Sequence, residues 1–328
     1  MFENKTILVT GGTGSWGHEL VRQLLEKTPR EIRIFSRNES SQVAMKRQFS
    51  DPRLTFIIGD IKEKDVLMRA TEGTDYIYHL AALKHVPVCE DQPLEALKTN
   101  VLGTQNVIDV AIKNKVDKVI YISTDKAANP SNFYGLTKAM GERLIIHANL
   151  LKTTTRFVCV RGGNVLGTNG SVIHVFKDQI SKNNQISITD MEMTRFFLTI
   201  EDAIKLLFKA SAESIGGEIF VMKMPTCKIT DLAKVLIAAS GKKNVGMAQL
   251  GIRPGEKLHE ILFSEYESQN TIAYDENYYV ILPTIEIPNL KTHYQHYPKV
   301  KLANYNSSEK LMSLEEIRTM LVKGRFLP

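Results

Sequence analysis

Residues 6–17 read TILVTGGTGSWG, in which a short apolar and β-branched run stops at a glycine-rich loop. Such a run, bounded by glycine, predicts a buried strand of a parallel sheet. The apolar side chains at positions 20, 21, 24 and 25 recur with the spacing of one helix face. Strand, glycine loop and helix in this order form the setting in which a dinucleotide-binding fingerprint operates. We therefore predict a nucleotide-binding unit at the start of the chain.

The glycines of this loop have separate expected tasks. Gly11 allows the tight turn after the strand, Gly14 lets the backbone approach a pyrophosphate at the helix N-terminus, and Gly17 lets helix and strand pack closely. The other loop residues included as candidate cofactor contacts are Thr13, Ser15 and Trp16.

Further apolar runs predict strands at 31–35, 54–58, 76–80, 118–122 and 156–160. Their alternation with helical patterns is typical of an α/β fold with a parallel sheet. We predict a Rossmann-type doubly wound parallel sheet in residues 1–164, which form an NADP-binding domain. We also predict a smaller mixed α/β substrate-binding lobe in residues 165–328, some segments of which return to the sheet.

Three other segments carry weaker signals. A helix is expected from about Pro93 to Lys113, and a capped closing helix from Ser313. The tyrosine-rich segment 265–308 has few apolar aliphatic residues and no clear period, so it is interpreted as surface or as an oligomer contact.

Composition narrows the class of function. The chain has 328 residues, 43% hydrophobic and 24% charged, and a formal charge of +6 without a run of basic residues. This argues against nucleic acid as a partner and suits an acidic small molecule. The three cysteines have no metal or redox spacing, which predicts a reducing compartment and no metal. No signal peptide and no apolar run of membrane-spanning length is found, so we expect a cytoplasmic protein without a membrane anchor.

The end of the second strand bears on the choice of cofactor. An acidic residue there would hold a ribose 2′-hydroxyl, but the sequence is Ser36-Arg37-Asn38. A guanidinium and a hydroxyl suit a 2′-phosphate, which favours NADP over NAD. The alternative is that Arg37 is a solvated surface charge and that Asn38 or Glu39 contacts the ribose.

Later strand ends supply more candidates. Asp60 and Ile61 follow the third strand and suit the adenine, an acid beside an apolar neighbour. Ala81 and Ala82 follow the fourth strand, where small residues leave room for a cofactor. Just beyond them, where open α/β sheets bind ligands, come Lys84 and His85. Asn100 interrupts the apolar face of the next helix; it is either a buried amide bonded to backbone or a residue that positions the catalytic strand, and we count it with the cofactor site.

Residues 123–138 read STDKAANPSNFYGLTK and follow the fifth strand. Tyr134 and Lys138 are four residues apart and therefore share a helix face. A nearby ammonium is expected to lower the pKa of a phenol, so that Tyr134 can take a proton from a sugar hydroxyl as hydride leaves the same carbon. Lys138 is also placed to bond the nicotinamide ribose.

Asp125 and Lys126 are not needed for an oxidation alone. A dehydration next to a new ketone requires a base for a carbon proton and an acid for the departing hydroxyl, and a carboxyl and an amine can supply both. The alternative is a surface salt bridge or a helix cap.

The chain resembles the extended short-chain dehydrogenase/reductases, and more narrowly the soluble UDP-N-acetylglucosamine 4,6-dehydratases, some of which invert C5. The resemblance covers about residues 4–265. It is carried by GGTGSWG at 11–17, FSR at 35–37, GDI at 59–61, AALKHVP at 81–87, STDKAANP at 123–130, YGLTK at 134–138, RGGNVLGTNGSV at 161–172, MTRFF at 193–197 and RPGEKLHE at 253–260. Membrane-linked relatives commonly carry methionine at the position of Tyr134, so this chain is grouped with the soluble branch.

The resemblance implies roles for single residues. Tyr134 deprotonates the C4 hydroxyl, Thr124 bonds the C4 oxygen, Lys126 removes the C5 proton and Asp125 protonates the leaving C6 hydroxyl. Arg195 is expected to pair with the diphosphate and Arg253 with a phosphate. The full set of implied substrate contacts is Lys84, His85, Asn164, Gly170, Ser171, Val172, Thr189, Met193, Arg195, Arg253 and Glu256. An alternative for Glu256 is an ion pair with Lys257.

The expected function is dehydration of UDP-N-acetylglucosamine by an NADP-dependent hydro-lyase, with or without C5 inversion. In the inverting case the resemblance implies the first step towards pseudaminic acid, as in flagellin glycosylation, and it implies a homo-oligomer, a dimer or hexamer. A UDP-sugar 4-epimerase, a 4-keto reductase, a partner enzyme acting on the dehydrated intermediate and a non-catalytic NADP-binding regulator remain alternatives.

Overall fold

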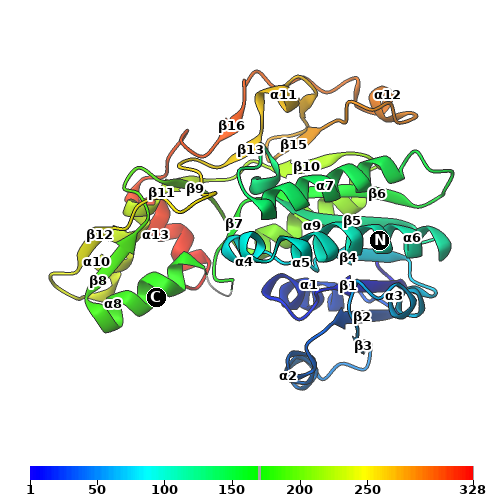
Figure 1. The fold of residues 1–328 in the computed structure, drawn as a ribbon, viewed down its shortest axis with the longest axis horizontal. Helices are drawn as coiled ribbons and strands as arrows, with labels where there is room; N and C mark the ends of the chain where they lie inside the picture. Colours follow the sequence, from blue (N-terminus) through cyan, green and yellow to red (C-terminus); the bar gives the residue numbers. More distant parts are fainter. Residues whose placement is uncertain (169–170, 328) are drawn as a thin grey trace.

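A large, mostly parallel sheet runs through the centre of the protein (Figure 1). The computed structural model describes residues 1–168 and 171–327. Within them the sheet has nine strands in the order β14-β15-β10-β6-β5-β4-β1-β2-β3. The parallel strands are β1 (Thr6–Thr10), β2 (Glu31–Ser36), β3 (Leu54–Ile58), β4 (Tyr76–His79), β5 (Lys118–Thr124), β6 (Arg156–Gly162) and β10 (Ile219–Met222). The predicted α/β fold with a Rossmann-type parallel sheet is confirmed.

Helices cover both faces of this sheet. The six long ones are α1 (Ser15–Leu25), α2 (Glu39–Phe49), α3 (Lys64–Thr71), α6 (Gly103–Lys113), α7 (Phe133–Ala148) and α9 (Ile200–Glu213). Helix α1 packs against α9, whereas α3, α6 and α7 form a second contiguous row. Right-handed crossovers account for α1 on one face and for α3, α6 and α7 on the other, because the chain moves outward from β1 to β3 and then returns to β4 on the other side of β1. Helix α9, which connects β6 to β10, departs from this rule and lies on the face of α1.

The helix expected between Pro93 and Lys113 is present but interrupted. It consists of α5 (Pro93–Leu97), a π-helical turn at Lys98–Leu102 and then α6, and it follows the short helix α4 (Val86–Asp91). Single π-turns inside α-helices are found most often at functional sites. This one carries Thr99 to the wall of the main cavity and buries Asn100.

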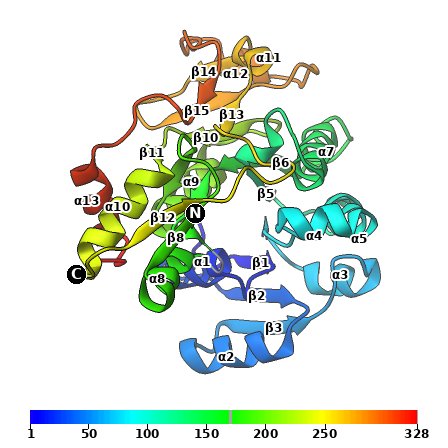
Figure 2. The same cartoon turned by 60° about the vertical axis from the view of Figure 1, so that its left-hand side comes forward.

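A second apolar core lies beside the sheet and is built from later segments (Figure 2). Its elements are α8 (Val172–Asn183), β8 (Gln185–Ile188), β9 (Thr194–Leu198), β11 (Thr226–Lys228), α10 (Ile229–Ser240), β12 (Gly246–Gln249) and α13 (Leu314–Lys323). Strand β7 (Asn164–Val165) pairs with β9 but packs its Val165 into the core of the central sheet. The closing helix α13 begins with a capping box between Ser313 and Glu316, which confirms the expected cap. In the part of the chain that the structure describes, no helix has the length and apolar character needed to cross a bilayer.

The surface interpretation of residues 265–308 is wrong for much of that segment. After β13 (Ile261–Phe263) come α11 (Glu265–Ser268), β14 (Thr271–Ala273), β15 (Tyr278–Ile281), α12 (Leu290–Tyr294) and β16 (Tyr305–Asn306). Strands β15 and β14 extend the central sheet as its antiparallel edge. Tyr278 and Tyr294 are buried, and the Tyr294 hydroxyl donates to Glu218 at 3.0 Å. Tyrosines here do the packing that aliphatic side chains usually do, which is why the sequence pattern was unclear.

A buried ion triad ties α7 and α11 to β6. The Arg161 guanidinium is 1% exposed and lies 2.6 Å from a Glu142 oxygen and 2.9 Å from a Glu267 oxygen. It also donates to the Leu262 carbonyl at 2.8 Å. We expect Arg161→Met to lower the free energy of unfolding by about 3–5 kcal/mol, because it leaves two buried carboxylates without their cation. Urea denaturation measures this. Arg143→Met, on an exposed position of α7, is the control, and equal losses in the two variants would contradict the expectation.

Candidate active site

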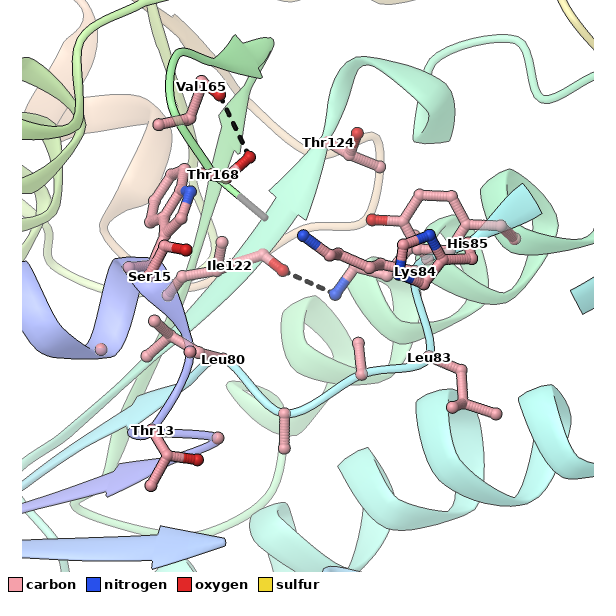
Figure 3. Close-up of a pocket in the computed structure, with 18 of the residues that line it drawn as sticks. Thr13, Ser15, Leu80, Leu83, Lys84, His85, Ile122, Thr124, Val165 and Thr168 are labelled. Atoms are coloured by element: carbon pink, nitrogen blue, oxygen red, sulfur yellow. Dashed lines mark hydrogen bonds between the residues drawn. The ribbon is translucent and has the colours of Figure 1, made fainter. Parts of the chain in front are cut away.

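A cavity of about 650 Å³ opens at the carboxyl ends of the parallel strands. It lies where β1 is flanked by β4 and β2, the point at which the strand order reverses. Ligands of open α/β sheets bind in the crevice at such switch points. Figure 3 shows Thr13 and Ser15 on one side of the cavity and Thr124, Lys84 and His85 on the other.

The glycine loop has the geometry that a pyrophosphate site requires. Gly11 has a φ of +68°, and a Cβ there would lie 2.8 Å from the Ala81 nitrogen, so no larger residue fits without a shift. A Cβ on Gly17 would come within 2.1 Å of the Gly12 oxygen. Gly14 is the N-cap of α1 and lines the cavity, and a Cβ there would meet only the Gly11 oxygen, at 3.4 Å, so an anion can approach the helix N-terminus. These residues, with Thr13, Ser15 and Trp16 on the same wall, fit a dinucleotide.

The far end of the cavity is lined by the residues expected near the adenosine: Ser36, Arg37, Asn38, Asp60 and Ile61. The Asn38 side chain is occupied as the N-cap of α2, since its oxygen accepts from the Ser41 nitrogen at 2.8 Å. The Arg37 side chain is 58% exposed and lies 3.7 Å from an Asp60 oxygen. Arg37 is therefore the cation at this end of the wall that can turn towards a ligand.

The segment after β4 crosses the cavity with Ala81, Ala82, Lys84 and His85 on its wall. Asn100 is not on that wall. Its amide oxygen accepts from the Leu83 nitrogen at 2.8 Å, and its amide nitrogen donates to the Leu83 carbonyl and to Thr137. The position of Asn100 therefore does not support the prediction that it contacts the cofactor. Its side chain instead fixes the segment that carries Lys84 and His85.

The Asp125-Lys126 pair lies in a short 3-10 turn at the end of β5 and is not a surface salt bridge. The Asp125 side chain is 1% exposed, and its Oδ1 lies 3.1 Å from the Lys126 Nζ. The Thr124 hydroxyl donates to the same Oδ1 at 2.7 Å. Lys126 lines the cavity, as do Thr124, Tyr134 and Lys138, whereas Asp125 lies behind them.

The expectation that a neighbouring cation lowers the pKa of Tyr134 is wrong for the protein as it stands. Burial raises the pKa of this phenol to about 12, and it outweighs the opposing effects of the Lys126 charge and the Thr124 hydroxyl. Lys138 donates instead to the Ile122 carbonyl at 2.6 Å and lies 3.9 Å from the centre of the Tyr121 ring. Its burial lowers the pKa of Lys138 to about 7, partly offset by Glu142.

The implied substrate contacts divide into two groups. Asn164, Ser171 and Val172 line the cavity, and Gly170 lies outside the described residues. Away from the cavity wall lie Thr189, Met193, Arg195, Arg253 and Glu256. Met193 packs in the second apolar core. The Arg195 guanidinium is committed to the Thr194 and Leu258 carbonyls, at 2.7 and 3.1 Å.

The turn at 253–257 docks onto the start of α7. The Gly255 carbonyl accepts from the Ser131 hydroxyl and from the Asn132 amide, each at 2.9 Å. Lys257 donates to the Ala128 carbonyl at 2.8 Å, so it does not pair with Glu256, whose oxygen lies 3.8 Å from Arg253 instead.

One acidic residue at the site was missed. Glu260 lies 3.3 Å from the Lys126 Nζ and is 3% exposed in its side chain. It stands in the RPGEKLHE stretch, but an acidic residue with no regular spacing to Lys126 gives no signal of its own.

Comparison with known proteins agrees with this geometry. Residues 7–282 match the family described as polysaccharide biosynthesis protein. A Campylobacter jejuni protein named UDP-N-acetylglucosamine 4,6-dehydratase (inverting) is 45% identical over 290 residues, which cover 87% of this chain and 85% of that protein. A Rickettsia canadensis protein named UDP-glucose 4-epimerase is 39% identical over 330 residues, covering 98% of this chain and 96% of that protein.

A solved structure has nearly the same fold over the whole length. The X-ray structure of Pen from Bacillus thuringiensis superposes with a TM-score of 0.91 at 37% identity, covering 98% of this chain and 99% of that one. The family match spans most of the chain, from the first strand of the sheet into its antiparallel edge. The chain therefore belongs to the polysaccharide biosynthesis protein family, on a fold of the extended short-chain dehydrogenase/reductase type.

Proposed function

We propose that the protein is an NADP-dependent 4,6-dehydratase of a UDP-N-acetylhexosamine. The observation that carries the proposal is the pair formed by the buried Asp125 and the half-buried Lys126 at the cavity, beside Tyr134 and Thr124. The name of the Campylobacter jejuni relative, which covers most of the chain at 45% identity, supports the same reaction.

Tyr134 begins the reaction by taking the proton from the C4 hydroxyl of the sugar. Thr124 lies next to Tyr134 and hydrogen-bonds the same oxygen, which fixes the sugar relative to the phenol. A nicotinamide dinucleotide held by the glycine loop and Lys138 would supply the hydride acceptor for C4 and the hydride donor for C6. Lys138, one helical turn beyond Tyr134, holds the ribose side of this site.

The 4-ketone makes the C5 proton acidic, and Lys126 removes it. Asp125, which lies behind Thr124 and Lys126 in the cavity wall, is the source of the proton that reaches the C6 oxygen; the C6–O bond breaks, and water leaves with the formation of a C5–C6 double bond. Hydride then reaches C6 and a proton returns to C5, so the product is a 4-keto-6-deoxy sugar, which is the substrate minus one water and has the same overall oxidation level. A base and an acid held side by side in a buried turn are the groups that this elimination needs.

An epimerase is the second candidate, because the Rickettsia canadensis relative named UDP-glucose 4-epimerase matches 98% of the chain. An epimerase at C4 needs an oxidation and a reduction at one carbon, for which Tyr134 and Thr124 suffice. Epimerisation leaves no task for an amine held between Asp125 and Glu260 on the cavity wall, and this favours the dehydratase.

The product NMR spectrum after incubation of the purified enzyme with UDP-N-acetylglucosamine and NADP tests the proposal. We expect the C6 hydroxymethyl signals to be replaced by a C6 methyl doublet. An intact hydroxymethyl with a changed C4 configuration would establish the epimerase instead. If the protein is instead a partner enzyme of the same pathway, it would act only on the 4-keto-6-deoxy sugar or its 5,6-ene precursor. Both compounds are therefore tested as substrates in the same assay.

The proposal includes inversion at C5, as in the name of the Campylobacter jejuni relative, and hence a product suited to pseudaminic acid synthesis. Ring proton couplings and deuterium at C5 distinguish inversion from retention. It also includes a homo-oligomer. Exposed apolar side chains on the neighbouring helical segments α5, Lys98–Leu102 and α7 support it: Leu94, Leu102, Leu136 and Met140. Light scattering gives the mass in solution.

The preference for NADP rests on Arg37. We expect Arg37→Ala to weaken NADP binding by about 10- to 100-fold, because a charge-assisted bond to the 2′-phosphate contributes about 1.5–3 kcal/mol. NAD, which has no 2′-phosphate, should bind the variant and the unchanged protein alike. Titration calorimetry with both cofactors measures this, and an equal loss for NAD would assign Arg37 to the shape of the site instead.

A further inference from the structure

The carboxylate of Glu260 reaches the catalytic turn from a distant part of the chain. Its Oε1 lies 3.3 Å from the Lys126 Nζ and 3.7 Å from the Arg195 Nε. Its Oε2 is buried and has no hydrogen-bond partner among the described residues. Buried carboxylates are costly unless they are paired, and an incompletely satisfied one in a cleft is a candidate for function.

The structure holds this carboxylate in place through its backbone. The Glu260 nitrogen donates to the Ser307 hydroxyl, and the Ser307 nitrogen donates to the Glu260 carbonyl, both at 2.9 Å. Ser307 is in turn bonded to Thr194 in β9. Arg195, the next residue, bonds the Leu258 carbonyl. The position of Glu260 is therefore set by two other segments and does not depend on Lys126.

Charged and titratable groups surround Lys126 from every element packed around the turn. They are Asp125 in the turn itself, Glu260 before β13, Arg195 in β9, Lys257 in the docked turn and Tyr134 in α7. Two carboxylates thus face the Lys126 amine, and two other cations compete for them. Because both carboxylates are buried, at 1% and 3% exposure, the charge on Lys126 depends on each of them.

We propose that Glu260 is a positioning residue for the C5 proton transfer: its carboxylate orients the Lys126 amine towards the cavity and stabilises the ammonium that forms when this amine takes the C5 proton. The inference rests on the proposed dehydratase function, in which Lys126 is the base. Asp125, on the other side of the amine and bonded to the Thr124 hydroxyl, keeps the role of acid that the proposed function gives it.

The arrangement has a consequence for pH dependence. Burial by itself lowers the pKa of Lys126, but Asp125 and Glu260 outweigh it and hold this pKa above its usual range. The amine must be neutral to take the C5 proton, so the rate of this step rises with pH. Removing the Glu260 charge lowers the pKa of Lys126, which moves the rising limb to lower pH by about 1–3 units, the usual effect of one opposite charge at this range.

The test compares the unchanged holoenzyme with Glu260→Gln, which keeps the shape and removes the charge, and with Glu265→Gln as the control. Glu265 is exposed in the first turn of α11, five residues further along the chain. Deuterium incorporation at C5 of UDP-N-acetylglucosamine is followed by NMR over a range of pH. Absorbance of the reduced nicotinamide in a single turnover follows C4 oxidation separately.

We expect the rising limb of the pH–rate profile for C5 exchange to move to lower pH in Glu260→Gln and to stay in place in Glu265→Gln. C4 oxidation should persist in both variants. The inference would be overturned if the pH–rate profiles of Glu260→Gln and the unchanged enzyme rose at the same pH, even where the rate falls. A merely structural residue lowers the rate without moving the profile along the pH axis. An unchanged enzyme that exchanges no C5 proton would defeat the dehydratase proposal itself, and the inference with it.

A second variant guards against misfolding. Glu260→Asp keeps the charge but moves it away from Lys126, so a smaller shift in the same direction is expected. If Glu260→Gln does not fold, a Glu260→Asp profile that coincides with that of the unchanged enzyme overturns the inference.

Discussion

Replacing Lys126 by alanine is expected to slow exchange of the C5 proton by about 10²–10⁴-fold, the usual contribution of a positioned general base. The variant should still bind NADP, because the wall formed by the glycine loop and Arg37 lies at the other end of the cavity. C4 oxidation should remain detectable, since Tyr134 and Thr124 are unchanged. NMR in deuterated buffer measures the exchange, and cofactor absorbance after gel filtration measures the bound dinucleotide.

The control for this experiment is Lys126→Arg, which keeps a cation between Asp125 and Glu260 but cannot lose its proton to become a base. Both variants should lose C5 exchange. The alanine variant should also lose about 3–5 kcal/mol of unfolding free energy, because two buried carboxylates lose their partner, whereas the arginine variant should retain most of it. Loss of the cofactor from Lys126→Ala would show that Lys126 is structural, and C5 exchange in Lys126→Arg would rule out its role as the base.

Tyr134→Phe is expected to slow C4 oxidation by about 10²–10⁴-fold, because the proton on the C4 oxygen then has no acceptor in place. Formation of reduced nicotinamide in a single turnover measures this step. C5 exchange should fall by the same factor, since the C5 proton becomes acidic only after the ketone has formed. The two variants thus differ in the steps that they slow. Lys126→Ala slows C5 proton exchange alone, whereas Tyr134→Phe slows both C4 oxidation and C5 exchange.

Tyr266→Phe, at an exposed position outside the cavity, is the control for loss of a phenol. The raised pKa of Tyr134 also predicts how the rate of C4 oxidation depends on pH. A phenol with a pKa of about 12 is almost wholly protonated at neutral pH, so the rate of C4 oxidation should still increase with pH above neutrality. A rate that is flat from pH 7 to 10, with substrate and cofactor saturating, would show that bound ligands lower this pKa into the neutral range.

Short-range patterns were sufficient for the first half of the fold. Strands there are short, mostly apolar runs, and the six predicted ones are present with nearly the same bounds. Except for the edge strand β3, these strands are largely buried on both faces, so most of their residues are apolar, and this makes them visible in the sequence. The strands of the tyrosine-rich segment were not recognised from the sequence, because its aromatic side chains pack without a regular period.

The candidate site was predictable where it follows strand ends in sequence. The carboxyl ends of parallel strands meet at one edge, so the glycine loop, Arg37, Lys84 and Lys126 were expected to share a cavity, and they do. Asn100, Met193 and Arg195 were placed less well, because a polar or large residue at a plausible position can equally bond the backbone or join a core. Only the surrounding segments decide between these uses.

The sequence alone therefore determined the sheet, the nucleotide loop and the close spacing of Asp125, Lys126, Tyr134 and Lys138, since each depends on neighbours within a few residues. The tertiary structure alone decided how that cluster is charged. Burial of Tyr134 and Lys138 shifts both pKa values, and Glu260, held by Ser307 from near the end of the chain, faces the Lys126 amine. Desolvation and contact between distant segments arise only when the chain is packed, so no local pattern of residues can encode them for a reader of the sequence.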